Sequence, residues 1–169
     1  MRMKVICISG TPGTGKTTLA KNLAQKLNFL YLDVNKVISK YKLAEGYDKK
    51  RKTKIVDTHK LKKFLILEIK NFSKANKKYN GIIIDSHLSH YLPRKYVDFC
   101  IVTKCDIKEL NKRLKEKGFH KEKIKENLEA EIFDICLTES KERKHKVIVI
   151  NTAKGFNIDN IYRKIKSKI

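Results

Sequence analysis

Short apolar runs alternate along the chain with stretches in which apolar residues recur every three or four positions. The runs predict five strands, in MKVICIS, FLYLDV, GIIIDS, VDFCIVTK and KVIVINT. GIIIDS is uniformly apolar, which favours a central strand buried on both faces. Strands that alternate with helices are typical of βαβ units, so the pattern predicts an α/β fold with a five-stranded parallel sheet flanked by helices.

Four stretches with helical spacing predict the helices that accompany these strands. Their apolar positions are Leu19, Leu23 and Leu27; Leu61, Phe64, Leu65, Ile69 and Phe72; Ile124, Leu128, Ile132 and Ile135 on one helix face; and Phe156, Ile161 and Ile165. Two charged segments, residues 44–57 and 115–123, interrupt the pattern and are expected to be irregular loops.

Length and composition limit the architecture. With 169 residues, 41% of them hydrophobic, the chain is expected to form a single domain, residues 1–169, with a sizeable core. No apolar run approaches the ~20 residues of a membrane span, and MKVICIS is expected to be a first strand and not a secretory signal. The four cysteines form no CxxC pair and are expected to be buried free thiols in a reducing cytosol.

The segment ISGTPGTGKTT, residues 8–18, lies between the first predicted strand and the first predicted helix. Gly10, Gly15, Lys16 and Thr17 satisfy the pattern GxxxxGK[ST]. Glycines let successive backbone N–H groups turn inward around phosphates, and the helix adds its positive amino end. The lysine is expected to reach the β- and γ-phosphates of ATP, and the threonine hydroxyl to bind Mg²⁺. The sequence therefore predicts a P-loop NTPase.

A second polar pair follows the predicted strand GIIIDSH. Asp85 at the strand end is expected to hold Mg²⁺ through water. His87, two residues on, is either a structural histidine or a group that orients a water molecule or an acceptor. Three fates of the phosphate stay open: transfer to an acceptor nucleotide, transfer to water, or use in a protein switch. The two charged segments are correspondingly candidates for an acceptor site and a lid, or plain surface loops.

Six segments resemble one family in their order along the chain: GTPGTGKTT, EGYD, IIIDSH, LPRKY, RLKEKGF and NLEAEIF. Over residues 4–165 the chain resembles the adenylate kinase isoenzyme 6 family, small atypical nucleoside-monophosphate kinases that also hydrolyse ATP. The resemblance implies the fold of that kinase type, the reaction ATP + AMP ⇌ 2 ADP, and Mg²⁺-dependent ATPase activity. It also implies a role in late maturation of the small ribosomal subunit, with a small-subunit ribosomal protein as partner.

The resemblance also implies roles for individual residues. Residues 33–57 become the monophosphate-binding part and residues 115–125 a short lid. The expected catalytic residues are Lys16, Asp85, His87 and Arg113, and the metal is expected at Thr17 and, through water, Asp85. The expected ATP contacts are Gly13, Thr14, Gly15, Lys16, Thr17, Thr18, Arg113, Lys117, Asn151, Thr152 and Ala153, the last three walling the adenine. The expected acceptor contacts are Lys36, Ser39, Lys40, Gly46, Tyr47 and Asp48.

Three positions in two segments depart from the family pattern. Ser39 stands where the family usually has an arginine on the helix of the monophosphate site, and Lys117-Gly118-Phe119 stands where the lid usually has Arg-Gly-Tyr. Arginine binds phosphate bidentately, whereas lysine is a point charge on a flexible stem. The departures weaken the prediction of a fast, selective AMP kinase and leave ATP binding and slow hydrolysis unaffected.

The charge balance favours a polyanionic partner. Lysine and arginine number 40 against 18 acidic residues, for a net charge of +22, which predicts binding to nucleic acid or a ribonucleoprotein, ribosomal RNA in the context of the resemblance. The alternative is a lysine-rich surface without a partner. The basic run at 48–54 is expected to contact either an acceptor phosphate or an RNA backbone. The basic runs at 141–146 and 163–169 are expected to be solvated surfaces or parts of a basic stripe that favours ribosomal RNA.

Two further functions stay open beside the adenylate kinase. One is a switch module in which ATP hydrolysis times release from a pre-ribosomal particle and phosphotransfer is vestigial. The other is a P-loop kinase of another small acceptor, such as a nucleoside or a shikimate-like metabolite. A cytoplasmic location is expected, with a nuclear one open for a eukaryotic protein, and no membrane partner is expected.

Overall fold

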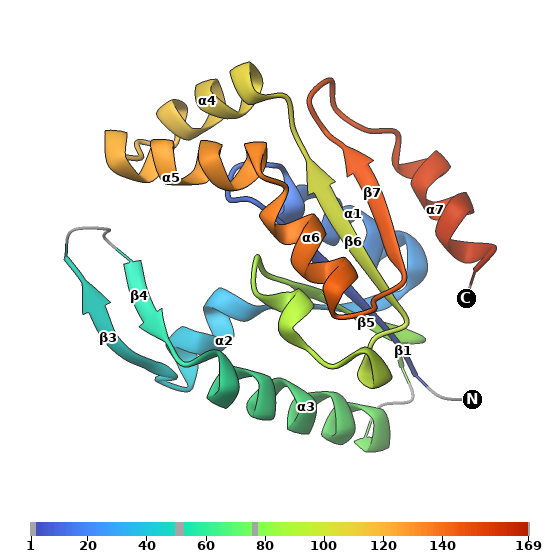
Figure 1. Cartoon of the computed structure of the whole chain (residues 1–169). Helices are drawn as coiled ribbons and strands as arrows, with labels where there is room; N and C mark the ends of the chain where they lie inside the picture. The colour runs from blue at the N-terminus through green and yellow to red at the C-terminus, as the bar shows by residue number, and fades with distance from the viewer. Residues whose placement is uncertain (1–2, 50–52, 76–77, 169) are drawn as a thin grey trace.

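A computed structural model of the chain describes residues 3–49, 53–75 and 78–168. Its centre is a parallel sheet of five strands in the order β2-β5-β1-β6-β7 (Figure 1). The strands are β1 Lys4–Gly10, β2 Phe29–Asp33, β5 Gly81–Asp85, β6 Phe99–Lys104 and β7 Val147–Asn151. The predicted α/β fold and all five predicted strands are confirmed.

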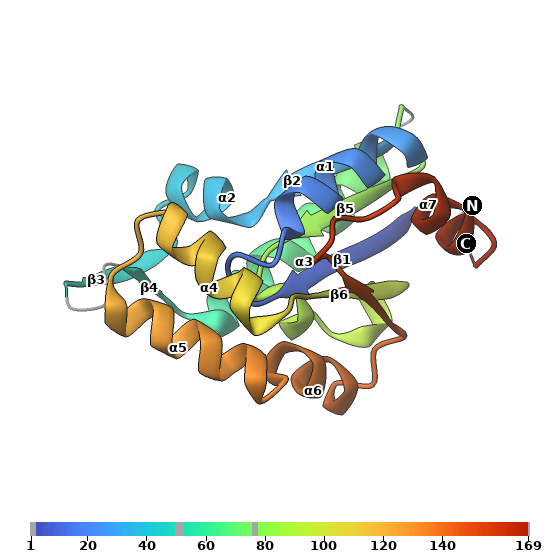
Figure 2. The same cartoon turned by 90° about the horizontal axis from the view of Figure 1, so that it is seen from above.

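Helices cover both faces of the sheet. They are α1 Lys16–Leu27, α2 Val34–Lys40, α3 Thr58–Ala75, α4 Ile107–Glu116, α5 Lys121–Ile132, α6 Ile135–Glu142 and α7 Ile158–Lys166, with two short 3-10 turns, η1 Ser89–Tyr91 and η2 Arg94–Tyr96. One core cluster joins the sheet to α1 and α7, and a second joins it to α3 and α6. Seen from above, α1 and α6 accordingly lie on opposite sides of the strands (Figure 2).

The strand GIIIDS is internal and buried on both faces, as predicted, although it is not the middle strand of the sheet. GIIIDS forms β5, which is buried throughout and paired on both sides, but β1 is the middle strand. A uniformly apolar run shows that a strand is internal, because both faces must be covered, and it does not give the strand's place in the order.

The predicted continuous helix face from Ile124 to Ile135 is wrong. Asp134 has a φ of 53°, in the left-handed region, and separates α5 from α6. Ile132 and Ile135, on either side of this break, are 57% and 43% exposed instead of buried. The apolar spacing alone therefore overestimated the length of the helix.

The two segments expected to be irregular are largely regular. Residues 44–56 contain an antiparallel hairpin, β3 Ala44–Asp48 and β4 Thr53–Val56, which projects from the edge of the molecule (Figure 1). Residues 50–52 of the basic run lie outside the described residues. Residues 115–123 comprise the end of α4, a turn at Gly118 and the start of α5. Alternating charged residues hid the pattern, because both hairpin strands are mostly exposed.

The four cysteines are free thiols, and three of them, Cys7, Cys100 and Cys105, are buried as expected. Within the described ranges, the helices are all too short or too polar to cross a bilayer.

Candidate nucleotide-binding site

The loop between β1 and α1 has a backbone that only glycine can adopt. Gly10 has a φ of 137°, and a Cβ there would lie 2.4 Å from the Thr103 hydroxyl oxygen. Gly13 has a φ of 93°, and its Cβ would lie 2.9 Å from a methyl carbon of Leu110 on α4. Both glycines thus combine a left-handed conformation with close approach of a neighbour. The pattern in the sequence therefore marks a real constraint on the backbone.

Buried hydroxyl groups fix the shape of this loop. The Thr14 hydroxyl donates to the Thr11 carbonyl at 2.7 Å and lies 2.6 Å from the Thr103 hydroxyl. The Thr152 hydroxyl, after β7, donates to the Thr14 carbonyl at 2.7 Å. All four threonines are at most 2% exposed. The loop is consequently pre-organised before any ligand arrives.

Lys16 begins α1, and its ammonium group folds back over the loop. Its Nζ donates to the Thr11 carbonyl at 3.0 Å. Burial lowers the pKa of Lys16 to about 8, with Lys117 acting in the same direction and Cys136, Asp85 and Glu131 opposing it. The amino end of α1 places its positive partial charge beside this ammonium group. The loop can therefore take an anion, which would replace the Thr11 carbonyl as the partner of Lys16.

Thr17 and Asp85 meet at the carboxyl end of the sheet. The Thr17 hydroxyl donates to Asp85 Oδ2 at 2.7 Å, and the Tyr31 hydroxyl donates to the same oxygen at 2.9 Å. Asp85 is 4% exposed. Burial and the Asp85 carboxylate raise the pKa of Tyr31, so its hydroxyl stays protonated and donates.

A hydroxyl and a carboxylate in contact are oxygen ligands of the kind that Mg²⁺ takes next to phosphates. The described residues hold no group of three or more His, Cys, Asp or Glu side chains able to hold a metal. A divalent ion here would therefore need phosphate or water oxygens to complete its ligands. Tyr31 had no signal in the sequence, because only the register that pairs Tyr31 with Ile83 places it beside the end of β5.

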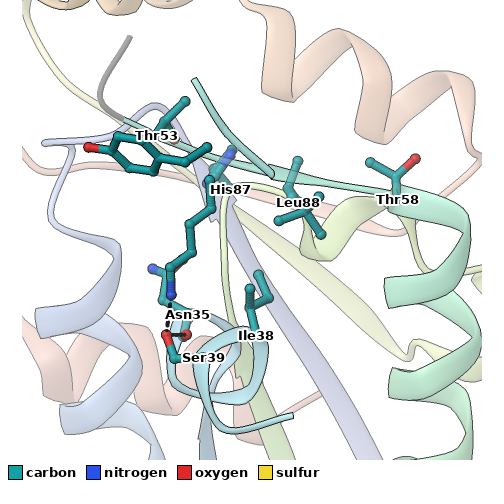
Figure 3. A pocket seen from close by; sticks show the side chains of 10 residues that line it. Asn35, Ile38, Ser39, Thr53, Thr58, His87 and Leu88 are labelled. Atoms are coloured by element: carbon teal, nitrogen blue, oxygen red, sulfur yellow. Dashed lines mark hydrogen bonds between the residues drawn. The ribbon is translucent and has the colours of Figure 1, made fainter. Parts of the chain in front are cut away.

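A hollow of about 520 Å³ opens next to the phosphate loop (Figure 3). It is lined by residues from α2, the β3–β4 hairpin, the start of α3 and the turn after β5: Asn35, Ile38, Ser39, Tyr47, Thr53, Lys54, Val56, Thr58, His87 and Leu88. His87 therefore belongs to this hollow. The His87 side chain is exposed at the mouth of the hollow. The protein atoms crowded around its ring and the positive charges of Lys16, His90 and Lys123 lower its pKa below the usual range, which favours the neutral ring at pH 7.

Among the described residues, the lysine that lines this hollow comes from the basic run 48–54 and not from α2, where Lys36 and Lys40 were expected. Lys54, on β4, donates to the Ser39 hydroxyl at 2.6 Å (dashed in Figure 3). Lys36 and Lys40 are exposed on α2 and do not line the hollow, and Lys40 instead lies over the Tyr41 ring. Lys54 ends the basic run 48–54, which was expected at an acceptor phosphate or on RNA. Nothing singled it out within that run, because the hairpin that carries it to α2 was expected to be a loop.

The other expected acceptor residues lie on β3. Tyr47 lines the hollow and is 58% exposed, whereas Gly46 and Asp48 do not line it. Gly46 faces the Ile55 side chain across the hairpin. The structure therefore brings Ser39 and Tyr47 together with His87, but not the other four predicted acceptor contacts.

Arg113 has several protein partners. Its guanidinium donates to the Thr152 and Ala153 carbonyls at 2.8 and 3.3 Å, and its Nε donates to Glu109 at 2.8 Å. Asn151 accepts from the Ala153 backbone N–H at 2.9 Å. The predicted adenine wall is thus tied to α4 by Arg113. Thr18 and the lid residue Lys117 are both exposed on the same side as the phosphate loop.

Glu131, in the segment NLEAEIF, is a buried carboxylate that sequence reasoning did not place in the site. It accepts from the Thr11 hydroxyl at 2.5 Å and from the Cys105 backbone N–H at 2.8 Å, and it lies 3.0 Å from Lys104 Nζ. It is 3% exposed. Glu131 therefore joins the phosphate loop to the end of β6.

A chain of hydrogen bonds behind the loop has the residue types of a hydrolase triad. Ser9 Oγ lies 2.7 Å from His90 Nδ1, and His90 Nε2 lies 2.6 Å from a Glu139 carboxylate oxygen. Ser9 is fully buried in the sheet, so no substrate carbonyl can reach it. The chain is consequently a structural tie between β1, η1 and α6.

The site corresponds to one protein family. Residues 6–134 match the family described as AAA domain. A Methanocaldococcus jannaschii protein named "putative adenylate kinase" is 35% identical over 163 residues, 96% of this chain and 86% of its own. The chain belongs to the adenylate kinase isoenzyme 6 family.

Eukaryotic members of the adenylate kinase isoenzyme 6 family are similarly close. The homolog of Caenorhabditis elegans is 32% identical over 85% of this chain and 76% of its own, and that of Schizosaccharomyces pombe is 37% identical over 86% and 78%. A solved structure titled "putative kinase" from Chloroflexus aurantiacus superposes with a TM-score of 0.59 over the whole of both chains, at 13% identity, which shows a shared fold alone.

Proposed function

We propose that this protein is an adenylate kinase that catalyses ATP + AMP ⇌ 2 ADP and also hydrolyses ATP. The observation that carries the proposal is the position of the hollow. His87 lines it, and Asp85, two residues earlier on the same turn, contacts Thr17 of the phosphate loop. An acceptor in the hollow would therefore lie directly beside the γ-phosphate of ATP held by the loop.

The loop residues have clear tasks in this reaction. Lys16 would pair with the β- and γ-phosphates, and the loop N–H groups would surround them. Thr17 and, through water, Asp85 would hold Mg²⁺, which when bound supplies positive charge to the phosphates. An oxygen of the acceptor phosphate forms a bond to the γ-phosphorus while the bond from that phosphorus to the bridging oxygen of ADP breaks. The chain contributes mainly position and charge.

Lys54 and Ser39 are the best candidates to hold the acceptor phosphate. They are hydrogen-bonded to each other in the hollow and come from different elements. Lys54 supplies the positive charge that an arginine at position 39 would carry, but as a single ammonium group it cannot make paired hydrogen bonds. Ile38, Val56 and Leu88 give the same hollow an apolar side on which a nucleobase can rest.

The adenine of ATP would lie on the wall formed by Asn151, Thr152 and Ala153, with Arg113 as the positioning residue that holds the wall in place. Lys117, at the tip of the short lid formed by residues 115–125, would approach the phosphates. The single lysine at the tip makes closure over the phosphates less specific than an arginine would.

The ATPase activity would use His87. A neutral imidazole can accept a hydrogen bond from a water molecule in the hollow and orient it toward the γ-phosphorus when no acceptor is bound. This arrangement also supports the second candidate function, a switch in which hydrolysis times release from a pre-ribosomal particle. The third candidate, phosphorylation of another small acceptor, is favoured by the volume of the hollow, about 520 Å³, and by the lack of an arginine among the described residues that line it.

A role in maturation of the small ribosomal subunit, with a small-subunit ribosomal protein and ribosomal RNA as partners, completes the proposal. Membership of the adenylate kinase isoenzyme 6 family and the net charge of +22 support it.

One set of assays tests these functions. ADP formation is measured with ATP alone, with ATP and AMP, and with ATP and each of CMP, GMP, UMP, a nucleoside or shikimate. Faster turnover with AMP than with the other acceptors is expected. Turnover that no acceptor accelerates would favour the switch, and acceleration by a non-nucleotide alone would favour the third function. Activity that survives removal of Mg²⁺ by a chelator would contradict the roles given to Thr17 and Asp85.

A further inference from the structure

The end of the molecule opposite the nucleotide site carries a basic hollow of about 570 Å³. It lies at the amino ends of the strands, where Lys4 begins β1 and Lys146 directly precedes β7. Arg94, Lys95 and Lys168 complete its cationic lining. The seven residues of β1 separate this hollow from the phosphate loop by roughly 20 Å. It is therefore not a part of the ATP or acceptor site.

The charges of this hollow are poorly neutralised by the protein. Asp98 is the only acidic residue in its described lining, and it accepts from the Val5 backbone N–H at 2.8 Å and lies 3.8 Å from Lys4 Nζ. Within the described ranges, no carboxylate lies at ion-pair distance from the other four cations. By contrast, cations on α4, α5 and the end of β6 have acidic partners, such as Lys104 with Glu131 and Arg113 with Glu109.

A second hollow, of about 330 Å³, adjoins the first through Lys95. It adds Lys70, Lys74 and the ring of Tyr96. The ammonium groups of Lys95 and Lys70 lie 5.3 and 5.9 Å from the centre of that ring. We call the two hollows together the basic groove. Aromatic rings between basic side chains are typical of surfaces that bind single-stranded nucleic acid, where bases stack and phosphates meet the cations.

We propose that the basic groove binds single-stranded RNA through its phosphate backbone, with Tyr96 as a stacking residue. Its hollowed shape, and the fact that four of the five cations around the first hollow have no acidic partner among the described residues, distinguish it from a lysine-rich surface that serves only solubility. Its position leaves the nucleotide site open, so both ligands can bind at once. The inference deepens the RNA partnership of the proposed function and rests on it for biological meaning, but it does not depend on phosphotransfer.

The test measures binding of a fluorescently labelled 12-nucleotide single-stranded RNA by anisotropy at several salt concentrations. The groove variant replaces Arg94, Lys95 and Lys146 with alanine, three exposed side chains. The matched control replaces Lys112, Lys125 and Lys141, also exposed and lying on α4, α5 and α6, and removes the same charge. Each phosphate contact to a single strand contributes about 0.7 to the slope of log affinity against log salt. The magnitude of this slope should therefore be smaller by about 2 in the groove variant than in the wild-type protein. The affinity of the groove variant for the RNA should be lower by at least about tenfold.

The control should keep the wild-type slope and affinity within about twofold. Equal losses in both triple variants would reduce the effect to net charge and overturn the proposal, as would wild-type protein that does not bind the RNA. Equal binding of a duplex of the same length would also overturn it, and binding to anionic vesicles but not RNA would assign the groove to membranes.

Two further measurements keep the outcome clear. Lys95→Glu alone should weaken RNA binding by about tenfold, even if the triple variant folds poorly. Tyr96→Leu should reduce affinity without changing the salt slope, because it removes stacking and no charge. Adenylate kinase assays on the same samples separate the two proposals: loss of RNA binding with unchanged phosphotransfer concerns the groove alone, and absent phosphotransfer with intact RNA binding concerns the proposed function alone.

Discussion

The two halves of the nucleotide site are built in different ways. On the ATP side, the hydroxyl groups of Thr11, Thr14 and Thr152 are buried and hydrogen-bonded, and Glu131 ties the loop to β6. On the acceptor side, Ser39 of α2 and Lys54 of the β3–β4 hairpin are exposed and hydrogen-bonded to each other, and Tyr47 and Ile55 of the same hairpin are 58% and 52% exposed. The phosphate loop is pre-organised by buried hydrogen bonds, whereas the side chains of the proposed acceptor side are mostly exposed.

This difference indicates that affinity for ATP and selectivity for the acceptor have different structural origins. Pre-organised donors bind phosphate without a cost of ordering, so the loop should bind ATP whatever the acceptor is. Exposed side chains must be ordered at the moment of binding, and each lysine loses considerable rotamer freedom. The acceptor should consequently bind more weakly than ATP. Substitutions in the phosphate loop should change the dissociation constant for ATP, and substitutions around the hollow should change the KM for the acceptor.

The largest effect is expected from Asp85→Asn, which should lower kcat by at least about 100-fold. The carboxylate charge that would position Mg²⁺ is lost, but the amide oxygen can still accept the two hydroxyl groups that now meet at Oδ2. The melting temperature should change little. Steady-state kinetics at saturating ATP and AMP measure the loss. Tyr31→Phe is the matched control: it removes one hydrogen bond and no charge, and should cost less than tenfold. Normal turnover by Asp85→Asn would mean that the metal is held elsewhere.

Next in size, Lys16→Ala should weaken ATP binding by about 10- to 100-fold. The substitution removes a charge-assisted contact worth roughly 1.5–3 kcal/mol. Titration calorimetry with ATP gives the dissociation constant directly. Asn22→Ala, exposed on α1 and outside the phosphate loop, is a control for local damage to the helix. Unchanged affinity in Lys16→Ala would refute the assignment of the phosphate loop.

A smaller effect is expected from pH. The pKa of Lys16 is lowered to about 8 from its ordinary value of 10.5, and the ammonium form is the one that binds phosphate. Affinity for ATP should therefore be constant below pH 8 and fall above it, by up to tenfold per pH unit. Calorimetry from pH 7 to 9.5 should also detect proton uptake on binding. Lys16→Ala should lose this dependence. Constant wild-type affinity up to pH 9.5 would show that the amine stays charged without ligand.

The smallest effects belong to the acceptor side. Lys54→Ala should raise the KM for AMP by about three- to tenfold and leave ATP binding unchanged, because it removes an exposed cation from the hollow. Lys36→Ala, exposed on α2 outside the hollow, is the control and should behave like wild type. Ser39→Arg should lower the KM for AMP, since a guanidinium can make paired hydrogen bonds to phosphate. If Lys36→Ala raises the KM and Lys54→Ala does not, the acceptor phosphate sits on the outer face of α2.

The loop and the strand ends could be predicted from the chain because their signals are local. The phosphate loop is indicated by glycines at fixed spacing and by a lysine and a threonine at the start of a helix. The sheet is indicated by five apolar runs. Neither signal requires knowledge of the residues that these elements contact in the fold. Asp85 was expected as the acid opposite the loop because parallel strands end at the same edge of a sheet. Leu19, Leu23 and Leu27 mark α1 for the same local reason, and all three are buried.

Only the tertiary structure decided which residues meet. Thr17 and Asp85 are 68 positions apart, Tyr31 and Asp85 are 54 apart, and Thr11 and Glu131 are 120 apart. Lys54, from the basic run 48–54, donates to the Ser39 hydroxyl and lines the hollow, whereas Lys36 and Lys40 do not, because the hairpin meets α2 at Ser39. Residue spacing encodes helices and strands, since their hydrogen bonds join near neighbours. The contacts between them depend on strand order, register and helix ends, and these are set by how the whole core packs.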